Sequence, residues 1–242
     1  MTRRQFIGMV FIIVVVSFLL SMNAGDGTEN FNIQFAFVYG WMDYQNVNAM
    51  LISFANWIFP QMILILFLGN IAEEQLYSML PYILTRAENP TKIWRKVYKK
   101  VIGISVVASG MFPLSLWSIL FVEGMRCSID REGWSQIICW ILYQVLCVLF
   151  LNVMAAYMPS IYGIGILLSG EVLLWFLQGM IFWEMFPAVI HKILPISTIW
   201  FFDGKEILQS DSTIGLGIFL IIVIVMLVWS IRYTGKRDIL SH

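Results

Sequence analysis

Few polar side chains lie inside the long apolar stretches of this sequence, and these few are the groups that could do chemistry there. They are Asn56, Gln61, Gln144, Asn152, Glu171 and Gln178. The members of the last two pairs are eight and seven positions apart, so each pair lies near one face of a helix. An ionisable group within a membrane is costly and indicates a function by default. We therefore take all six residues as candidates for a substrate pathway, with a hydrogen-bonded packing role for Glu171 as the alternative.

The motifs of several enzyme classes are absent from the chain. Gly204–Lys205 and Gly235–Lys236 have neither the spacing nor the Ser/Thr of a nucleotide-binding G-x-x-x-x-G-K-[ST] loop. There is no H-E-x-x-H sequence, and His191 and His242 alone indicate neither a histidine zinc site nor a Ser-His-Asp triad. We therefore expect no enzyme activity, no catalytic residue, and no metal or cofactor bound by this chain.

The composition indicates which kind of element must position the polar residues. Hydrophobic residues make up 60% of the 242 residues and charged residues only 12%, too few charges for the surface of a soluble domain. Apolar runs of about 20 residues match the hydrocarbon thickness of a bilayer, where the backbone must pair with itself in helices. We expect one all-α transmembrane domain over residues 1–242. Its six spans are predicted at about 5–22, 49–69, 101–122, 136–157, 160–183 and 214–231.

The distribution of basic residues predicts the orientation of these spans. With the N-terminus inside, the inner segments are 1–4, 70–100, 158–159 and 232–242. They carry 11 of the 15 Lys and Arg residues. Because Lys and Arg accumulate on the cytoplasmic side, we expect both ends of the chain in the cytoplasm. The location expected for this multi-pass protein is the cell membrane, and specifically a bacterial plasma membrane.

Two of the connecting segments have patterns of their own. The outer segment 184–213 is mostly apolar up to Phe202, but Pro187 and Pro195 interrupt it. It is too short and too broken to span, so we expect a re-entrant helical hairpin at the outer surface.

The inner segment 70–100 predicts two helices. Glu73 and Glu74 lie near the start of the first, where acids suit the helix dipole. Asn89 can cap the second helix, with Pro90 at its first position and five basic residues after it. The basic residues alone fit a stop signal beside anionic headgroups. The amphipathic first helix favours a surface that docks onto a cytoplasmic partner.

The same segment carries a resemblance to a known family. Glu74, then Tyr82-Ile83-Leu84-Thr85-Arg86, then Trp94-Arg95-Lys96 resembles the first cytoplasmic loop of ABC exporter permeases of the type-two family. The resemblance implies a cytoplasmic coupling helix between the second and third spans. It implies that the residues coupling it to an ATPase are Glu73, Glu74, Tyr82, Thr85 and Arg86.

The resemblance also implies partners. ABC ATPase subunits would bind ATP and Mg, and a second permease, identical or homologous, would complete a dimer in contact with membrane lipid. Nucleic acid is not an expected partner. The compact loops look most like bacterial permeases that export or expel peptides, drugs or lipid-like molecules, including the immunity permeases of lantibiotic producers. The sequence departs from the family in one respect, because only Met1 to Arg4 precede the first span, where an amphipathic elbow helix is usual.

Other classes of function remain open on the residues alone. A secondary transporter or channel working by itself would need an ion site within the membrane, and Glu171 is the one residue that offers it. A membrane assembly factor or sensor would need no transport pathway at all. An intramembrane enzyme is the weakest alternative, because the catalytic groups are missing.

Overall fold

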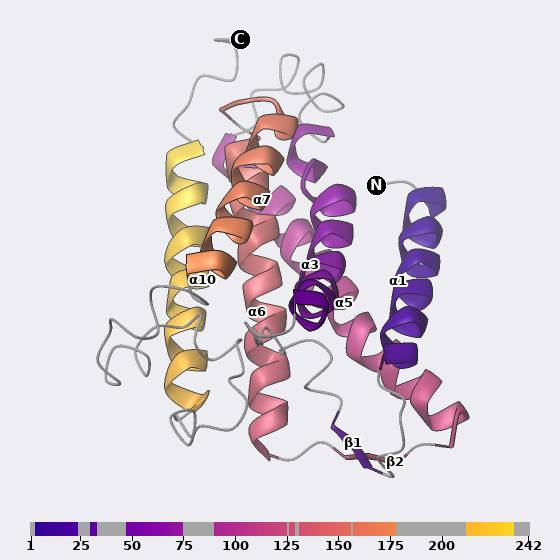
Figure 1. Cartoon of the computed structure of the whole chain (residues 1–242). Coiled ribbons are helices and arrows are strands. Elements are labelled where there is room, and N and C mark those ends of the chain that lie inside the picture. The colour runs from indigo at the N-terminus through magenta and orange to yellow at the C-terminus, as the bar shows by residue number, and fades with distance from the viewer. Residues whose placement is uncertain are drawn as a thin grey trace.

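A computed structural model describes residues 3–23, 30–32, 47–74, 90–124, 126–128, 131–155, 157–177 and 212–234. Six long helices make up most of this part of the chain (Figure 1). They are α1 (Arg3–Asn23), α3 (Val47–Leu68), α5 (Pro90–Val122), α6 (Arg131–Met154), α7 (Ser160–Leu177) and α10 (Ser212–Thr234).

The prediction of a helical protein is confirmed, with one small addition. Strands β1 (Asn30–Asn32) and β2 (Arg126–Ser128) pair in parallel, three residues each. They join the two segments that the sequence places in the first and second outer loops. The sequence pattern contains no run of alternating residues long enough to reveal such a short pair.

Helix α5 differs most from its predicted range. The basic helix and the third apolar stretch form one continuous helix of 33 residues that starts at Pro90. Proline suits this first position because its missing N–H would have no helical partner there. As Figure 1 shows, α5 crosses the bundle diagonally, so its basic beginning and its apolar end lie at opposite ends of the molecule.

The helices differ in whether they are long and apolar enough to cross a membrane. Over the residues that the structure describes, the segment Trp94–Val122 of α5 is long and apolar enough to cross a bilayer. Four further apolar helical segments are shorter: Gln5–Leu19, Trp140–Met154, Ser160–Leu173 and Leu220–Arg232. The predicted re-entrant hairpin at 184–213 lies outside the described residues except for its last two positions, which begin α10.

The helices pack around α5 and α6. Helix α1 lies against α5, α10 lies against α6, and α3 contacts α1, α5 and α6. The first turn of α1, the last turn of α10 and the start of α7 are at one end of the bundle (Figure 1). The β1–β2 pair is at the other end.

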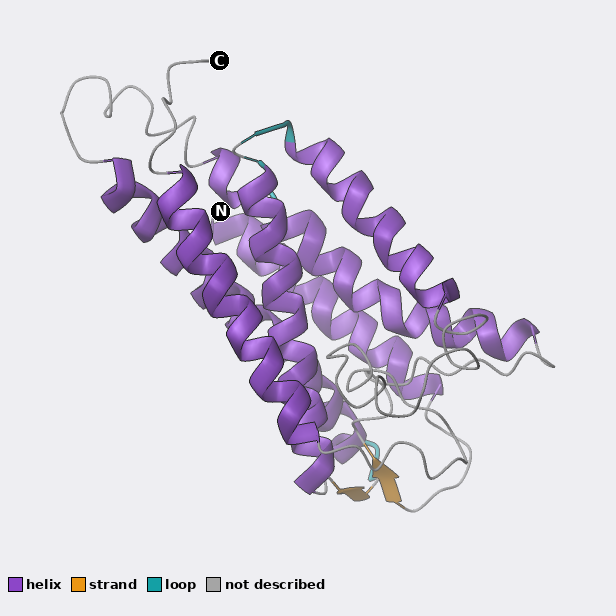
Figure 2. Ribbon diagram, turned by 90° about the vertical axis from the view of Figure 1, so that its left-hand side faces the viewer, coloured by secondary structure: helices purple, strands orange, loops and turns teal. Residues whose placement is uncertain are grey.

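Helix α3 changes direction along its length. Its first turns are seen nearly end-on in Figure 1 and project sideways in Figure 2, whereas its later turns run with the bundle. Pro60 lies inside this helix. Because proline has no N–H and its ring crowds the preceding turn, it accounts for the bend.

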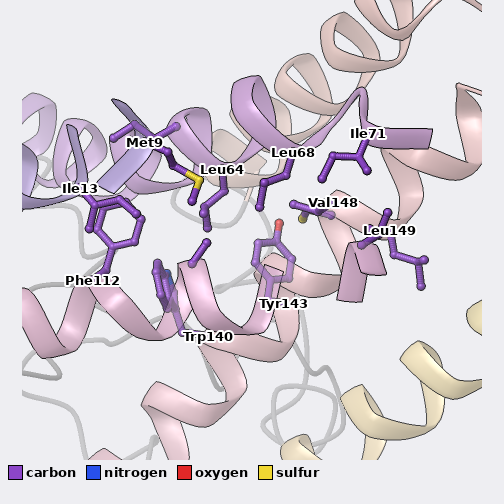
Figure 3. Close-up of a cluster of buried hydrophobic side chains, with 14 of the residues drawn as sticks. Met9, Ile13, Leu64, Leu68, Ile71, Phe112, Trp140, Tyr143, Val148 and Leu149 are labelled. Carbon is purple, nitrogen blue, oxygen red and sulfur yellow. The ribbon is translucent and has the colours of Figure 1, made fainter. Parts of the chain in front are cut away.

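One continuous apolar core joins four of the helices. Figure 3 shows side chains from α1, α3, α5 and α6 meeting in it, with Ile71 from the turn that follows α3. The ring of Phe112 meets the ring of Trp140 edge to face, with 6.0 Å between their centroids. The labelled residues are Met9, Ile13, Leu64, Leu68, Ile71, Phe112, Trp140, Tyr143, Val148 and Leu149.

A close approach between α3 and α6 depends on Gly69, which follows α3 directly. A Cβ atom at this position would lie 2.5 Å from the carbonyl oxygen of Ile65 and 3.0 Å from Cδ1 of Leu151. Both distances are shorter than normal contacts, so only glycine fits here without a shift of the backbone.

Gly69→Ala is therefore expected to lower the free energy of unfolding by about 1–3 kcal/mol through overpacking. Gly165→Ala is the matched control, because a Cβ there meets nothing within 4 Å and alanine favours the helix. Thermal unfolding in detergent micelles would measure both variants. Equal melting temperatures for the two would contradict the tight contact at Gly69.

Candidate functional site

In the described part of the molecule, large apolar side chains are exposed along the helices, and nine polar residues are buried within a mostly apolar core. Large side chains are strongly exposed along the helices, such as Phe11 at 67%, Phe121 at 69% and Ile161 at 71%. The buried polar residues are Ser17, Ser21, Gln61, Ser105, Ser109, Gln144, Asn152, Glu171 and Ser230. The core is apolar, as in a soluble protein, but so many large apolar side chains exposed on the outer faces are unusual for a surface in contact with water.

The hydroxyl groups of the buried serines are all hydrogen-bonded. Ser105 and Ser109 donate to the carbonyl oxygens four residues earlier in α5, both at 2.7 Å. The hydroxyls of Ser17 and Ser115 bond to each other and connect α1 with α5. Such bonds satisfy the hydroxyl groups within an apolar bundle and leave none of these serines available for chemistry.

Asn152, fully buried on α6, fastens the end of α3. Its Nδ2 donates to the carbonyl oxygens of Leu68 and Val148, both at 2.8 Å. Its Oδ1 accepts from the backbone N–H of Ala72 at 2.7 Å. Helix α3 ends at Leu68, and a new helical turn begins at residue 71. Main-chain groups freed by this break need partners, and Asn152 supplies them.

Glu73 continues the same connection to α7. Its Oε2 accepts from the backbone N–H of Ser160 at 3.2 Å. Ser160 is the first residue of α7, where N–H groups lack helical partners and a negative charge is favourable. The neighbouring Glu74 accepts from Nδ2 of Asn70 at 3.3 Å. Both predicted coupling carboxylates therefore lie where the end of α3, α6 and the start of α7 converge. We use the name Asn152–Glu73 clamp for these two side chains and the main-chain groups of Leu68, Ala72 and Ser160 to which they bond.

Glu171 is the one buried ionisable acid of the described residues, and it contacts α6. The hydroxyl of Tyr143 donates to its Oε1, and Sγ of Cys147 lies 3.4 Å from the same oxygen. Its Oε2 is buried and has no hydrogen-bond partner among the residues that the structure describes. The packing role that was the alternative for Glu171 thus accounts for one carboxyl oxygen and leaves the other unused.

Gln61 and Gln144 present the opposite case to Asn152. Both side chains are 0% exposed. Neither the amide oxygen nor the amide nitrogen of either residue has a hydrogen-bond partner in the part of the chain that the structure describes. Buried amides without partners are rare in proteins and call for an explanation.

Helix α5 begins with an amphipathic segment. Trp94, Val97 and Tyr98 are buried, and the rings of Trp94 and Tyr98 stack with 5.5 Å between centroids. The exposed side is basic and consists of Lys92, Arg95, Lys96, Lys99 and Lys100. This end of α5 can therefore meet anionic headgroups or an acidic protein surface.

The remaining predicted site residues are only partly described. Asn56 lies on α3, but its side chain is outside the described residues, as are Gln178, Tyr82, Thr85 and Arg86 altogether. The structure brings Asn152 together with Glu73 and Glu74, two sets that the sequence assigned to separate roles. Sequence reasoning missed Tyr143, Cys147 and Ser160. The i, i+4 spacing of Tyr143 and Cys147 on one face was the available signal.

No protein family, curated protein or solved structure matches this chain in the comparisons made with each.

The contrast between two buried amides on α6 gives a direct test of the clamp. Asn152→Leu is expected to destabilise the fold by about 1–3 kcal/mol for each main-chain group left unpaired. Gln144→Leu, on the same helix and equally buried, removes no bond and is expected to keep or raise the stability. Denaturant unfolding in micelles would compare them. A larger loss for Gln144→Leu than for Asn152→Leu would contradict these assignments.

Proposed function

We propose that this chain is the membrane-spanning permease subunit of an ATP-driven transporter of the ABC exporter kind. The observation that carries the membrane part of the proposal is the large number of bulky apolar side chains exposed along the helices. Contiguous exposed apolar surface of this extent fits contact with lipid.

We take the six helices as six crossings, with both ends of the chain in the cytoplasm. The six helices have 21, 22, 33, 24, 18 and 23 residues in chain order. About 20 residues are needed to cross the hydrocarbon layer. In this arrangement, the clamp and the basic start of α5 are on the cytoplasmic side, which agrees with the bias of Lys and Arg.

The coupling mechanism follows from the clamp. The proposed ATPase docks on the inner segment that leaves the helical turn at 71–74 and returns at Pro90. Movement of this turn is transmitted to α6 through Asn152, which bonds to Leu68 and Ala72. It is transmitted to α7 through the bond between Glu73 and the N–H of Ser160. A displacement at the docking surface would thus shift three helices together.

One observation favours a second candidate, a secondary transporter that works without an ATPase. Glu171, Tyr143 and Cys147 form a buried cluster of groups that can exchange protons. A pull-down separates the candidates, because an ATP-driven permease is expected to bring an ATPase with it and a lone transporter is not. Transport in membrane vesicles that requires ATP hydrolysis would exclude both the lone transporter and a non-transporting sensor.

Variants of the inner segment test the coupling step itself. Charge reversal by Glu74→Lys or Arg86→Glu is expected to uncouple the ATPase from the permease. Glu73→Ala is expected to leave the ATPase bound but to abolish transport, because the bond to the start of α7 is lost. Glu123→Ala, an exposed acid just after α5 and at the far end of the bundle, is the control that should change neither. Full ATPase association and full transport in the charge-reversal variants would contradict the role given to this segment.

A further inference from the structure

Gln61 and Gln144 lie on the sides of α3 and α6 that face each other. Gln61, Leu64 and Leu68 are spaced i, i+3 and i+7, so they share one side of α3. Figure 3 shows Leu64 and Leu68 opposite Tyr143 and Val148 of α6. On α6, Gln144, Val148 and Leu151 are spaced i, i+4 and i+7, so they also share one side.

The two helices approach each other closely two turns beyond the glutamines. There Asn152 bonds to the carbonyl oxygen of Leu68, and Leu151 packs at the position of Gly69. Gln61 is seven residues before Leu68, and Gln144 is seven residues before Leu151. Both amides are therefore on the same seam, at a similar distance from the clamp.

Neither amide has a structural reason to be there. A primary amide has two donor hydrogens and an acceptor oxygen, and at both positions all of these are buried without partners in the described part of the chain. Leucine or methionine would fill the same volume without the cost of an unpaired polar group. Asn152 shows what a structural amide looks like in this bundle, because both ends of its amide are bonded.

Gln61 also follows Pro60, where α3 bends. A proline leaves the helix without one hydrogen bond, so this point can change its angle at lower cost than an intact turn. A change in this angle would separate the seam and give the two amides access to water.

We propose that Gln61 and Gln144 form a polar site between α3 and α6 that opens to water and receives an uncharged amide- or hydroxyl-bearing group. An uncharged group is specified because the buried residues of the described part include no Lys, Arg or His to balance an anion. The one buried acid of the described part, Glu171, lies on α7 and contacts Tyr143 and Cys147, not the two glutamines, so it is not placed to balance a cation between them. That the group belongs to a transported molecule rests on the proposed function, whereas the opening of the site does not.

Cysteine accessibility tests the opening without any ATPase. In a chain with Cys127, Cys139 and Cys147 replaced by serine, Gln61→Cys and Gln144→Cys would be labelled with N-ethylmaleimide in membrane vesicles. A thiol reacts as the thiolate, which needs water. Ala108→Cys and Leu116→Cys are matched controls, because both positions are 0% exposed and lie on α5, outside the seam between α3 and α6. Labelling several-fold faster at the two glutamine positions supports the site. Equal rates at all four positions, fast or slow, overturn it.

Protection from labelling tests which chemical class of ligand the site receives. N-dodecylacetamide, an uncharged amide with an apolar tail, is expected to slow labelling at both glutamine positions several-fold. Dodecanoate and dodecyltrimethylammonium, with the same tail and a charged head, are expected not to slow it. No protection by the amide, or equal protection by all three compounds, overturns the ligand class. If membrane vesicles with this protein showed no ATP-driven transport, that result would count against the proposed function and not against this site.

Discussion

The break between α3 and the turn at 71–74 is the constraint on which the rest of the structure depends. A helix that ends inside an apolar bundle leaves main-chain N–H and C=O groups that water cannot reach. Asn152 of α6 pairs with one group on each side of the break, the carbonyl of Leu68 and the N–H of Ala72. Gly69 lies in this break, where a Cβ atom would crowd the carbonyl of Ile65 in α3 and the side chain of Leu151 in α6. The position of the inner segment relative to α6 follows from this one side chain.

The polar residues of the bundle thus divide by whether their atoms are paired. Asn152 and Glu73 hold main-chain groups at helix ends, so their role is to connect elements. Glu171 accepts hydrogen bonds at Oε1, whereas its Oε2 has no partner among the described residues. The side-chain amides of Gln61 and Gln144 make no hydrogen bond within the described part of the chain. They can therefore bond to another molecule, or to other groups of the protein in a different conformation.

The sequence predicts the elements better than it predicts their contacts. Apolar run lengths locate the helices to within a few residues because that pattern is local. The continuity of α5 was missed, although Pro90 was correctly predicted at its first position, since a basic turn followed by an apolar run reads as two elements. The pairing of β1 with β2 depends on residues almost a hundred positions apart, which no local pattern encodes.

The roles of the candidate site residues also depend on contacts that local sequence patterns do not predict. Spacing placed Gln144 and Asn152 near one helical face and suggested one role for both, but their roles differ. Asn152 meets the break in α3, and Gln144 meets no partner. Only the relative position of α3, itself set by Pro60 and Gly69, separates a clamp from an unpaired amide. In the same way, the acids of the inner segment were predicted to couple to a partner, and the bond from the Ser160 N–H of α7 to Glu73 is a contact that the sequence did not predict.

The proposed function requires that the clamp end of the bundle is cytoplasmic and the opposite end is external. The direct measurement is the labelling of single cysteines with a membrane-impermeant maleimide in right-side-out and inverted vesicles, in the cysteine-free chain. Met158→Cys beside the clamp and Arg232→Cys in the last turn of α10 are predicted to react only in inverted vesicles. Glu123→Cys just after α5 is predicted to react only in right-side-out vesicles. Labelling of all three positions from the same side would contradict the account.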